Sequence, residues 1–311
     1  MRAGGKKILI TGGAGFIGSA LARACLEAGF KVVVVDDFSR GRVCNLPPGV
    51  RIYRLDVRAQ DRLVDVFRRE RPVVVSHHAA LVSVRESVAK PDLYWQINVD
   101  GTRNVLQAAQ SCGARHFVFA SSGGAIYGEA ERLPLDEDAP CRPISPYGES
   151  KLAAEEVIRS SAFAGIKTIL RYGNVYGPGQ DPANNNGVIA IFARALQEGR
   201  RPVIFGDGSQ SRDYVYVSDV VAAHMLAVQQ GAAGVFNIAS GQARSLREVY
   251  NRIAALLGVD IPPRYLPENA FEVRHNGLAI ERSRQVLGWT PQVDFSSGLK
   301  ATLQVLQEET V

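Results

Sequence analysis

The segment Lys7-Ile-Leu-Ile-Thr-Gly-Gly-Ala-Gly-Phe-Ile-Gly18 constrains the fold of this 311-residue chain more than any other feature. A short apolar run precedes closely spaced glycines, and a helical pattern follows them. Glycine permits a tight turn and lets backbone N–H groups approach a pyrophosphate at the start of a helix. A glycine triplet alone is weak evidence, because structural turns use the same residues. The strand before it and the helix after it favour dinucleotide binding, with expected contacts at Gly12, Gly15, Phe16, Ile17 and Gly18.

Short apolar runs alternate with helical stretches through the first half of the chain. The expected strands are residues 7–11, 31–36, 51–55, 73–76, 116–121 and 167–172, and the expected helices are 16–28, 61–69 and 93–112. Strands that are apolar on both faces suit a parallel sheet covered by helices on each side. We therefore expect an α/β fold, a Rossmann-type doubly wound parallel sheet with ligands at the carboxyl ends of its strands.

A second, smaller unit is expected after a connection rich in Gly, Pro and Asn, at 177–182 and 184–187. Later expected elements are a helix at 188–198, a strand at 202–205, a helix opened by a capping box at Ser245 and Glu248, and a helix at 297–308. These pieces are too short for an independent domain. The expected division is a dinucleotide-binding domain at 1–176 and 213–240, with a smaller C-terminal α/β substrate-binding lobe at 177–212 and 241–311.

Composition limits the partners and the compartment. Hydrophobic content of 46% and charged content of 22% are ordinary for a globular enzyme. The net charge of +5 comes from scattered Lys and Arg, so we expect no nucleic-acid partner, whereas small phosphorylated ligands fit. The four cysteines show no CxxC spacing, which favours free thiols in a reducing compartment. Without an apolar run of about 18 residues or a signal-like N-terminus, we expect no membrane partner and a cytoplasmic location.

Acidic residues at strand ends bear on the choice of cofactor. Asp36 and Asp37 end the second strand about 20 residues after the glycines, where a carboxylate can hold a ribose diol. The same charge would repel a 2′-phosphate, so we expect NAD, although Arg40 and Arg42 could accommodate a phosphate. Asp56, with Val57, is a candidate for the adenine edge, and a turn-forming Asp is the alternative.

Tyr147 and Lys151 form the candidate reactive pair. Ser145 and Pro146 before them are typical of an N-cap and a first helical position. Residues four apart share a helix face, so a phenol would lie beside an ammonium. Lowering a tyrosine pKa from ~10 by roughly three units requires about 4 kcal/mol. We expect the lysine, the helix N-terminus and a bound cationic nicotinamide to supply it, and the alternative is an ordinary surface pair.

Further motifs follow in one order along nearly the whole chain. They are Asp56-Val57, His77-His-Ala-Ala80, Asn98-Val-Asp-Gly-Thr102, Ser121-Ser-Gly-Gly-Ala-Ile-Tyr-Gly128, Arg171-Tyr-Gly-Asn-Val-Tyr-Gly-Pro178, Phe205-Gly-Asp-Gly and Arg212-Asp-Tyr-Val-Tyr-Val-Ser-Asp219. With the glycine turn and the Tyr-x-x-x-Lys pair, this set resembles the extended short-chain dehydrogenase/reductases. Within that family it resembles the UDP-glucose (UDP-galactose) 4-epimerases.

The resemblance implies a role for each matching position. Tyr147 would be the catalytic acid/base, Lys151 would hold the nicotinamide ribose, and Ser122, with Ser121 as the alternative, would bond the sugar hydroxyl. The cofactor cleft would be lined by Ala79, Ala80, Asn98 and Tyr172. The expected substrate contacts are Asn174 and Arg212 at the diphosphate, with Val188, Phe205 and Arg274.

The implied activity is an NAD-dependent epimerisation at C4 of a UDP-hexose. Tyr147 would take the proton of the sugar 4-OH while hydride passes to NAD, and a 4-keto intermediate would receive hydride on its opposite face. The resemblance also implies a homodimer through the helices that start near Val99 and Pro146. No metal is expected, and His77, His78 and His116 are interpreted as structural.

Three departures affect the substrate. Gly123-Gly124 stand where sugar-nucleotide 4,6-dehydratases have an Asp-Glu pair, which disfavours water elimination. Asp181 stands where some UDP-uronate epimerases have an arginine, which favours a neutral hexose. The family's C-terminal arginine motif aligns with 269–272 and lacks the arginine, so Arg274 could replace it or could be solvated or paired with Glu. With Asn276 near the N-acetyl position, UDP-N-acetylhexosamine and UDP-uronate epimerisation stay open, as do other hydride-based sugar-nucleotide chemistry and a non-catalytic NAD(H)-binding sensor.

Overall fold

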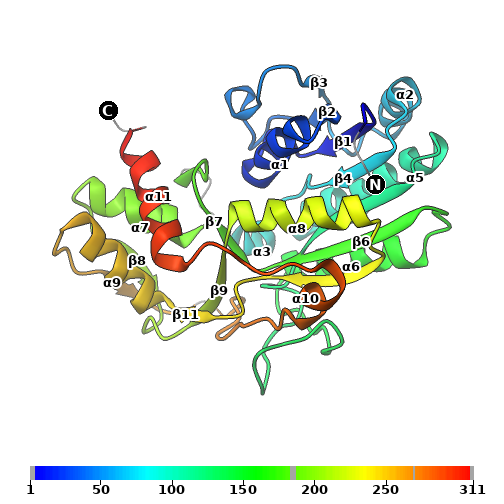
Figure 1. Cartoon of the computed structure of the whole chain (residues 1–311). Helices are drawn as coiled ribbons and strands as arrows, with labels where there is room; N and C mark the ends of the chain where they lie inside the picture. Colours follow the sequence, from blue (N-terminus) through cyan, green and yellow to red (C-terminus); the bar gives the residue numbers. More distant parts are fainter. Residues whose placement is uncertain (1–3, 183–186, 269, 309–311) are drawn as a thin grey trace.

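The computed structural model describes residues 4–182, 187–268 and 270–308, which form two lobes (Figure 1). Within these residues the larger lobe is built on a seven-stranded sheet of order β10-β6-β5-β4-β1-β2-β3, paired in parallel throughout. Its strands are β1 Lys7–Thr11, β2 Lys31–Asp36, β3 Arg51–Arg54, β4 Val74–His77, β5 His116–Ser122, β6 Ile166–Tyr172 and β10 Gly234–Ile238. The strand order reverses beside β1, as in doubly wound nucleotide-binding sheets, and the predicted Rossmann-type fold is confirmed.

Helices cover both faces of this sheet. One face packs against α1 Phe16–Glu27 and α8 Val217–Gln230, and the other against α2 Gln60–Glu70, α5 Gly101–Ser111 and α6 Pro146–Ser160. Alternate residues of β1 serve the two cores, because Ile8 and Ile10 face the first pair while Leu9 faces the second group. The strands inside the sheet therefore need apolar residues on both sides, as the sequence predicted.

The prediction of two apolar faces is wrong for β3. This strand pairs only with β2, at the edge of the sheet, and Ile52 is 39% exposed. Its polar side chains bind the end of α2 instead, since Arg51 and Tyr53 donate hydrogen bonds to Glu70 at 2.9 and 2.5 Å. An edge strand has one neighbour fewer, so its burial is incomplete.

The predicted helix at 93–112 is present, but it is not a uniform α-helix. It consists of α4 Pro91–Trp95, a π-helical segment at Gln96–Asp100 (η2) and then α5. The wider turn holds the buried Asn98, whose carbonyl accepts the Thr102 hydroxyl at 2.6 Å. Single π turns occur frequently at functional sites, and this one faces the segment that follows β4.

The smaller lobe lies at the left of Figure 1. Its sheets are β11-β9-β7 and β12-β8, formed by β7 Asn174–Tyr176, β8 Val203–Phe205, β9 Ser211–Tyr216, β11 Ala243–Ser245 and β12 Arg264–Leu266. Helices α7 Val188–Gln197, α9 Leu246–Leu257 and α11 Phe295–Glu308 share one core around Phe192, Ile253 and Leu299. The capping prediction is confirmed, because the Ser245 side chain accepts the N–H of Glu248.

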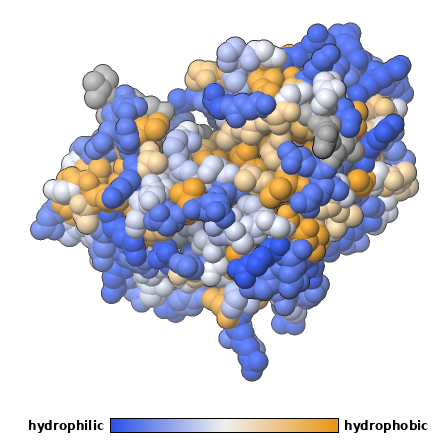
Figure 2. Space-filling model, viewed as in Figure 1, coloured by the Kyte–Doolittle hydropathy of each residue, from blue (hydrophilic) through white to orange (hydrophobic). Residues whose placement is uncertain are grey.

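Short helices complete the described chain: η1 Val43–Asn45, α3 Val84–Ala89 and α10 Glu281–Leu287. Figure 2 shows a recess in the outline between the smaller lobe and the α1 side of the larger lobe. In the described ranges, no helix combines the length and apolar character needed to cross a membrane.

Candidate active site

Helix α6 presents Tyr147 and Lys151 to the interior. The Ser145 side chain accepts the N–H of Gly148 at 3.1 Å and Pro146 is the first helical residue, so the predicted helix start is confirmed. Both functional side chains are buried, at 8% and 4% exposure, so this is not a surface pair. A Cβ at Gly148 would lie 2.5 Å from the carbonyl oxygen of Ala125. Glycine thus lets the first turn of α6 approach the segment that follows β5.

The two adjacent serines at the end of β5 have different partners. Ser122 lies beside Tyr147, close enough for its hydroxyl to lower the pKa of the phenol. Ser121 instead donates to the buried carboxylate of Glu155 at 2.6 Å. Of the two alternatives left open by the sequence, Ser122 is therefore the one beside the phenol.

The electrostatics of the pair differ from the expectation. Burial raises the pKa of Tyr147, and the contact with Ser122 acts in the opposite direction. Burial also lowers the pKa of Lys151 to about 7. The Lys151 ammonium donates to the carbonyl oxygen of Ala120 at 2.5 Å and lies 4.2 Å from the ring centre of Phe119. Both contacts of the Lys151 ammonium are thus with β5.

The glycine turn leaves no room for side chains. Gly12 has φ +66°, and a Cβ there would lie 2.6 Å from the backbone nitrogen of Ala79. A Cβ at Gly18 would lie 2.2 Å from the carbonyl oxygen of Gly12. Gly15 is the N-cap of α1, and Phe16 and Ile17 form its first turn. The turn thus presents the start of a helix at the carboxyl end of β1, a suitable cradle for a pyrophosphate.

Asp36 connects this turn to the end of β2. Its carboxylate accepts the N–H groups of Ala14 at 2.9 Å and Phe38 at 2.8 Å. Burial raises the pKa of Asp36, and these two hydrogen bonds lower it. The neighbouring Asp37 accepts the backbone and hydroxyl of Ser39, so it stabilises the following turn.

The two arginines that could have accepted a 2′-phosphate are engaged elsewhere. Arg40 pairs with Glu86 at 2.6 Å, and Arg42 pairs with Asp181. Both guanidinium groups are already compensated by carboxylates, which favours a cofactor without that phosphate. Asp181 is thus directed toward the segment after β2.

Three predicted cofactor residues have contacts within the protein. Asp56 accepts the backbone and guanidinium of Arg58, which is the turn-forming alternative, and Val57 is buried in the core under α5. Asn98 is 1% exposed and bonds both backbone groups of Leu81 and the hydroxyl of Ser150. The side chain of Asn98 thus braces α6 against the segment that contains Ala79 and Ala80.

The predicted substrate residues gather around the start of the smaller lobe. Arg212 donates to the carbonyl oxygen of Arg274 at 3.2 Å, so these two arginines are neighbours. The Arg274 guanidinium lies 3.9 and 4.0 Å from the carboxylates of Asp207 and Glu268, which matches the carboxylate-paired alternative. The departure noted at Asn269 lies outside the described residues.

The remaining predicted residues begin or end nearby elements. Asn174 starts β7, with its side-chain oxygen 3.2 Å from a Cβ built on Gly124, Val188 starts α7, and Phe205 ends β8. Sequence reasoning missed Arg85. Its guanidinium carbon lies 3.6 Å from the ring centre of Phe205, and its Nε donates to Glu272 at 3.0 Å. An arginine on the short helix α3 carries no local signal of a contact with residues 120 or more positions away.

Gly123 and Gly124 lie close to side chains of other segments. A Cβ at Gly123 would lie 2.5 Å from Leu278 Cδ1, and one at Gly124 would be 3.2 Å from Asn174 Oδ1. An Asp-Glu pair at these positions would need rearrangement of Leu278.

The histidines interpreted as structural are hydrogen-bonded. His77 contacts the hydroxyls of Thr11 at 2.6 Å and Thr102 at 2.9 Å, and burial lowers its pKa to about 3. His116 contacts the hydroxyl of Thr168 at 2.7 Å.

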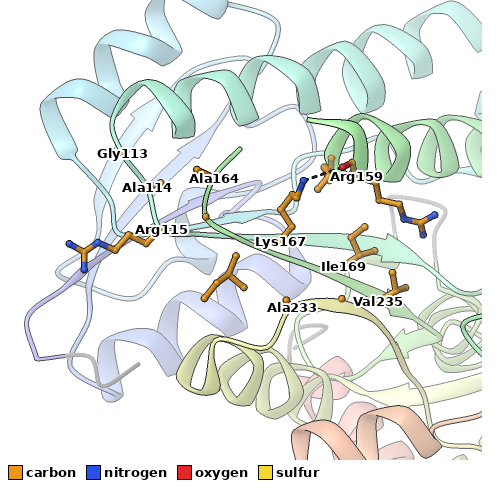
Figure 3. A pocket seen from close by; sticks show the side chains of 13 residues that line it. Gly113, Ala114, Arg115, Arg159, Ala164, Lys167, Ile169, Ala233 and Val235 are labelled. Atoms are coloured by element: carbon orange, nitrogen blue, oxygen red, sulfur yellow. Dashed lines mark hydrogen bonds between the residues drawn. The ribbon is translucent and has the colours of Figure 1, made fainter. Parts of the chain in front are cut away.

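A surface hollow of about 950 Å³ lies at the opposite, amino ends of the strands (Figure 3). Apolar residues and the cations Arg115, Arg159 and Lys167 line it, at the amino ends of β5, β6 and β10. Lys167 donates to backbone carbonyls at the end of α6, and Arg159 pairs with Glu155. None of the residues described above lines this hollow, so the candidate active site lies at the carboxyl ends of the strands.

A doubly wound sheet with a glycine turn and a buried Tyr-x-x-x-Lys pair beside a serine is the arrangement of the extended short-chain dehydrogenase/reductases. The chain belongs to the NAD dependent epimerase/dehydratase family, whose model matches residues 8–239. It is 38% identical to UDP-glucose 4-epimerase of Mycolicibacterium smegmatis over 314 residues, covering 98% of this chain and 99% of that protein.

Solved structures agree with this membership. UDP-glucose 4-epimerase of Thermotoga maritima, solved with UDP-glucose, has a TM-score of 0.94 and 38% identity over 98% of this chain and 100% of that one. UDP-glucose 4-epimerase of Thermus thermophilus, solved with NAD, has a TM-score of 0.92 and 38% identity over 97% of this chain and 99% of that one.

Proposed function

We propose that this protein is an NAD-dependent UDP-glucose 4-epimerase, which inverts C4 of a UDP-hexose. The observation that carries the proposal is the buried pair of Tyr147 and Lys151, one turn apart on α6, with Ser122 beside the phenol. The names of the similar proteins from Mycolicibacterium smegmatis and Thermotoga maritima support it.

The cofactor would lie along the carboxyl edge of the sheet. Gly12, Gly15 and Gly18 would hold the pyrophosphate, and Asp36 the adenosine ribose. Oxidised nicotinamide would supply a reversible hydride acceptor and a positive charge. The pairing of Arg40 and Arg42 with carboxylates supports NAD over its 2′-phosphorylated form.

The protein residues would manage the proton. Tyr147 would accept it from the sugar 4-OH, and Ser122 would hold that hydroxyl in line. Lys151 would give up its bond to Ala120 to reach the cofactor ribose, where a charged ammonium stabilises the phenolate. Once the 4-keto sugar has turned over in the site, hydride would return to the opposite face of C4 and Tyr147 would return the proton to the C4 oxygen, so no net oxidation results.

The smaller lobe would bind the nucleotide. We propose Asn174, Arg212 and Arg274 at the diphosphate, and Val188 and Phe205 at the remaining surface of the UDP. Asp56, Ala79, Ala80, Asn98 and Tyr172 stay proposed cofactor contacts, direct or through the backbone they brace. In the proposed division, β7 and β9 are assigned to the substrate-binding lobe, because both strands belong to the sheet of the smaller lobe.

One observation favours a UDP-N-acetylhexosamine as a second candidate substrate. Asn276 is 1% exposed and donates to the carbonyl oxygen of Gly123, while its Oδ1 has no hydrogen-bond partner. An acetamido N–H would satisfy that oxygen. Parallel assays with UDP-galactose, its N-acetyl form and a UDP-uronate would rank the three.

Substitution Tyr147→Phe tests the chemistry. Loss of the acid/base should reduce turnover of UDP-galactose by roughly 10²- to 10⁴-fold, while NAD stays bound. Tyr250→Phe is the matched control, since this tyrosine also makes one hydrogen bond, to the carbonyl oxygen of Ile261, but lies in the smaller lobe. Full turnover by the Tyr147→Phe protein would remove the proposed mechanism.

We further propose a homodimer formed through α4, α5 and α6, and a cytoplasmic location. In α6, Ala154 and Ile158 lie in the core and Val157 packs partly against it, while Ala153 is partly exposed. The free state of all four cysteines supports a reducing compartment.

A further inference from the structure

A chain of hydrogen bonds runs under the carboxyl ends of β4 and β6. His78 Nε2 lies 2.9 Å from Ser76 Oγ, which lies 3.2 Å from His224 Nε2. The other nitrogen of His224, Nδ1, lies 3.3 Å from the hydroxyl of Tyr172. Ser76, His224 and Tyr172 are buried, and His224 comes from α8, on the back of the sheet.

Both ends of this chain lie at the proposed cofactor site. Tyr172 pairs in register with Ser122, and its carbonyl oxygen accepts the N–H of Gly123 at 2.8 Å. The backbone N–H of His78 donates to Thr11 at 3.0 Å, and its carbonyl carbon would lie 2.8 Å from a Cβ on Gly12. One end therefore supports the strand of the reactive serine, and the other supports the glycine turn.

The two ends also contact each other. The rings of His78 and Tyr172 are stacked, with centres 6.4 Å apart and planes at 21°. The rings of His78 and His224 are 5.4 Å apart. The hydrogen bonds and the ring contacts thus hold one closed group of side chains.

The chain has a direction because its imidazoles are neutral. Burial lowers the pKa of His78 to about 3 and that of His224 well below its ordinary value. Each hydrogen bond therefore has a single proton. If Tyr172 donates to His224, then His224 donates to Ser76 and Ser76 donates to His78. In the reverse order His78 donates to Ser76, Ser76 donates to His224, and His224 donates to Tyr172. The Tyr172 proton is then directed away from His224.

A buried histidine with a purely structural role could satisfy each ring nitrogen with any nearby backbone group. His224 instead uses side chains of two strands, each directly beside a residue of the site. We infer that His224 is a positioning residue of the cofactor site, which holds Tyr172 beside Ser122 and, through Ser76, His78 against the glycine turn. This inference rests on the proposed function, because the positioned groups are those assigned to NAD.

Substitution His224→Leu removes both hydrogen bonds and keeps an apolar side chain. We expect the purified protein to retain NAD roughly three- to tenfold less well on dialysis, with a lower kcat and an unchanged KM for UDP-galactose. His224→Gln, which keeps a donor and an acceptor, should restore part of the retention. Tyr172→Phe should add little to His224→Leu, because both substitutions remove the same bond.

His116→Leu is the matched control. This buried histidine likewise contacts a side-chain hydroxyl, that of Thr168, but it makes one such bond where His224 makes two, and it lies at the amino end of β5. It should lose stability and keep both NAD retention and turnover. If His224→Leu fails to fold, Ser76→Ala provides the same readouts with a smaller change.

Equal NAD retention and equal kcat in folded His224→Leu and His116→Leu proteins would overturn the inference. Additive effects of His224→Leu and Tyr172→Phe would also overturn it. If the wild-type protein retains NAD but does not epimerise UDP-galactose, the proposed function fails, while NAD retention still tests the positioning role.

Discussion

At the scale of single residues, the Tyr147–Lys151 pair depends on what the cofactor brings. The protein alone raises the pKa of Tyr147 by burial and lowers that of Lys151 to about 7 by burial. Both shifts favour the neutral forms in a dry site. A cationic ligand next to the phenol would reverse the first shift, so the reactive phenolate belongs to the loaded protein.

The lysine predicts a pH dependence of stability in the cofactor-free protein. Its pKa is 10.5 in the unfolded reference and about 7 when folded, so the unfolded chain binds more protons between these values. The free energy of unfolding should therefore rise with pH between about 7 and 10.5, by at most about 1.4 kcal/mol per pH unit. Below pH 7 the destabilisation caused by burying the Lys151 charge should be fully present. Lys151→Met should lack this rise.

Thermal unfolding of both proteins at pH 6.5, 8 and 9.5 measures the difference. The stability of the wild-type protein relative to Lys151→Met should increase as the pH increases. Parallel curves for the two proteins would mean that the ammonium remains fully charged in the folded state.

At the scale of elements, α6 is held in place by a buried ion pair. Arg171 on β6 binds both carboxylate oxygens of Glu155, at 3.0 and 2.8 Å, and its remaining nitrogen bonds the hydroxyl of Tyr127. Glu155 lies one turn after Lys151 and also accepts Ser121. Strands β5 and β6 are thereby joined to the helix that presents the reactive pair.

Glu155→Gln should be strongly destabilising, because it leaves the Arg171 charge buried without its counter-ion. The expected loss in the free energy of unfolding is about 3–5 kcal/mol by urea titration. Glu156→Gln, at the adjacent exposed position, should change it by less than about 0.5 kcal/mol. Comparable losses in both variants would show that the ion pair does not hold α6.

Elements with a local signature were predictable from the sequence, and those set by distant contacts were not. The glycine turn and the Ser145 and Ser245 caps depend on neighbouring residues, so the patterns predict them. The π turn at Asn98, the exposure of β3 and the contact of Arg85 with Phe205 depend on tertiary packing. The choice between Ser121 and Ser122 likewise needed the position of Glu155.

At the scale of the whole molecule, partly exposed ion pairs contribute to the contact between the two lobes. Arg42 reaches Asp181, and Arg85 reaches Glu272. Such exposed pairs contribute about 0–1 kcal/mol each. These two pairs therefore add little to the free energy that holds the lobes together.

The outer surface of the larger lobe predicts self-association. Val88 on α3 and Trp95 on α4 are large apolar side chains with 38% and 47% exposure, on helices that pack against α6. Exposed apolar residues that gather on one surface mark an interface more often than isolated ones do. In the proposed homodimer, a charge at Trp95 would be buried at the contact without a partner.

Trp95→Glu should therefore sediment as one 33.7 kDa chain where wild type sediments as two. Val286→Glu is the control, because Val286 is similarly exposed, at 52%, but lies on α10. It should leave the mass of the particle unchanged. A wild-type monomer would exclude the proposed homodimer, and α6 would then be stabilised only within a single chain, by Glu155 and Arg171. A dimeric Trp95→Glu protein would place the contact on another surface.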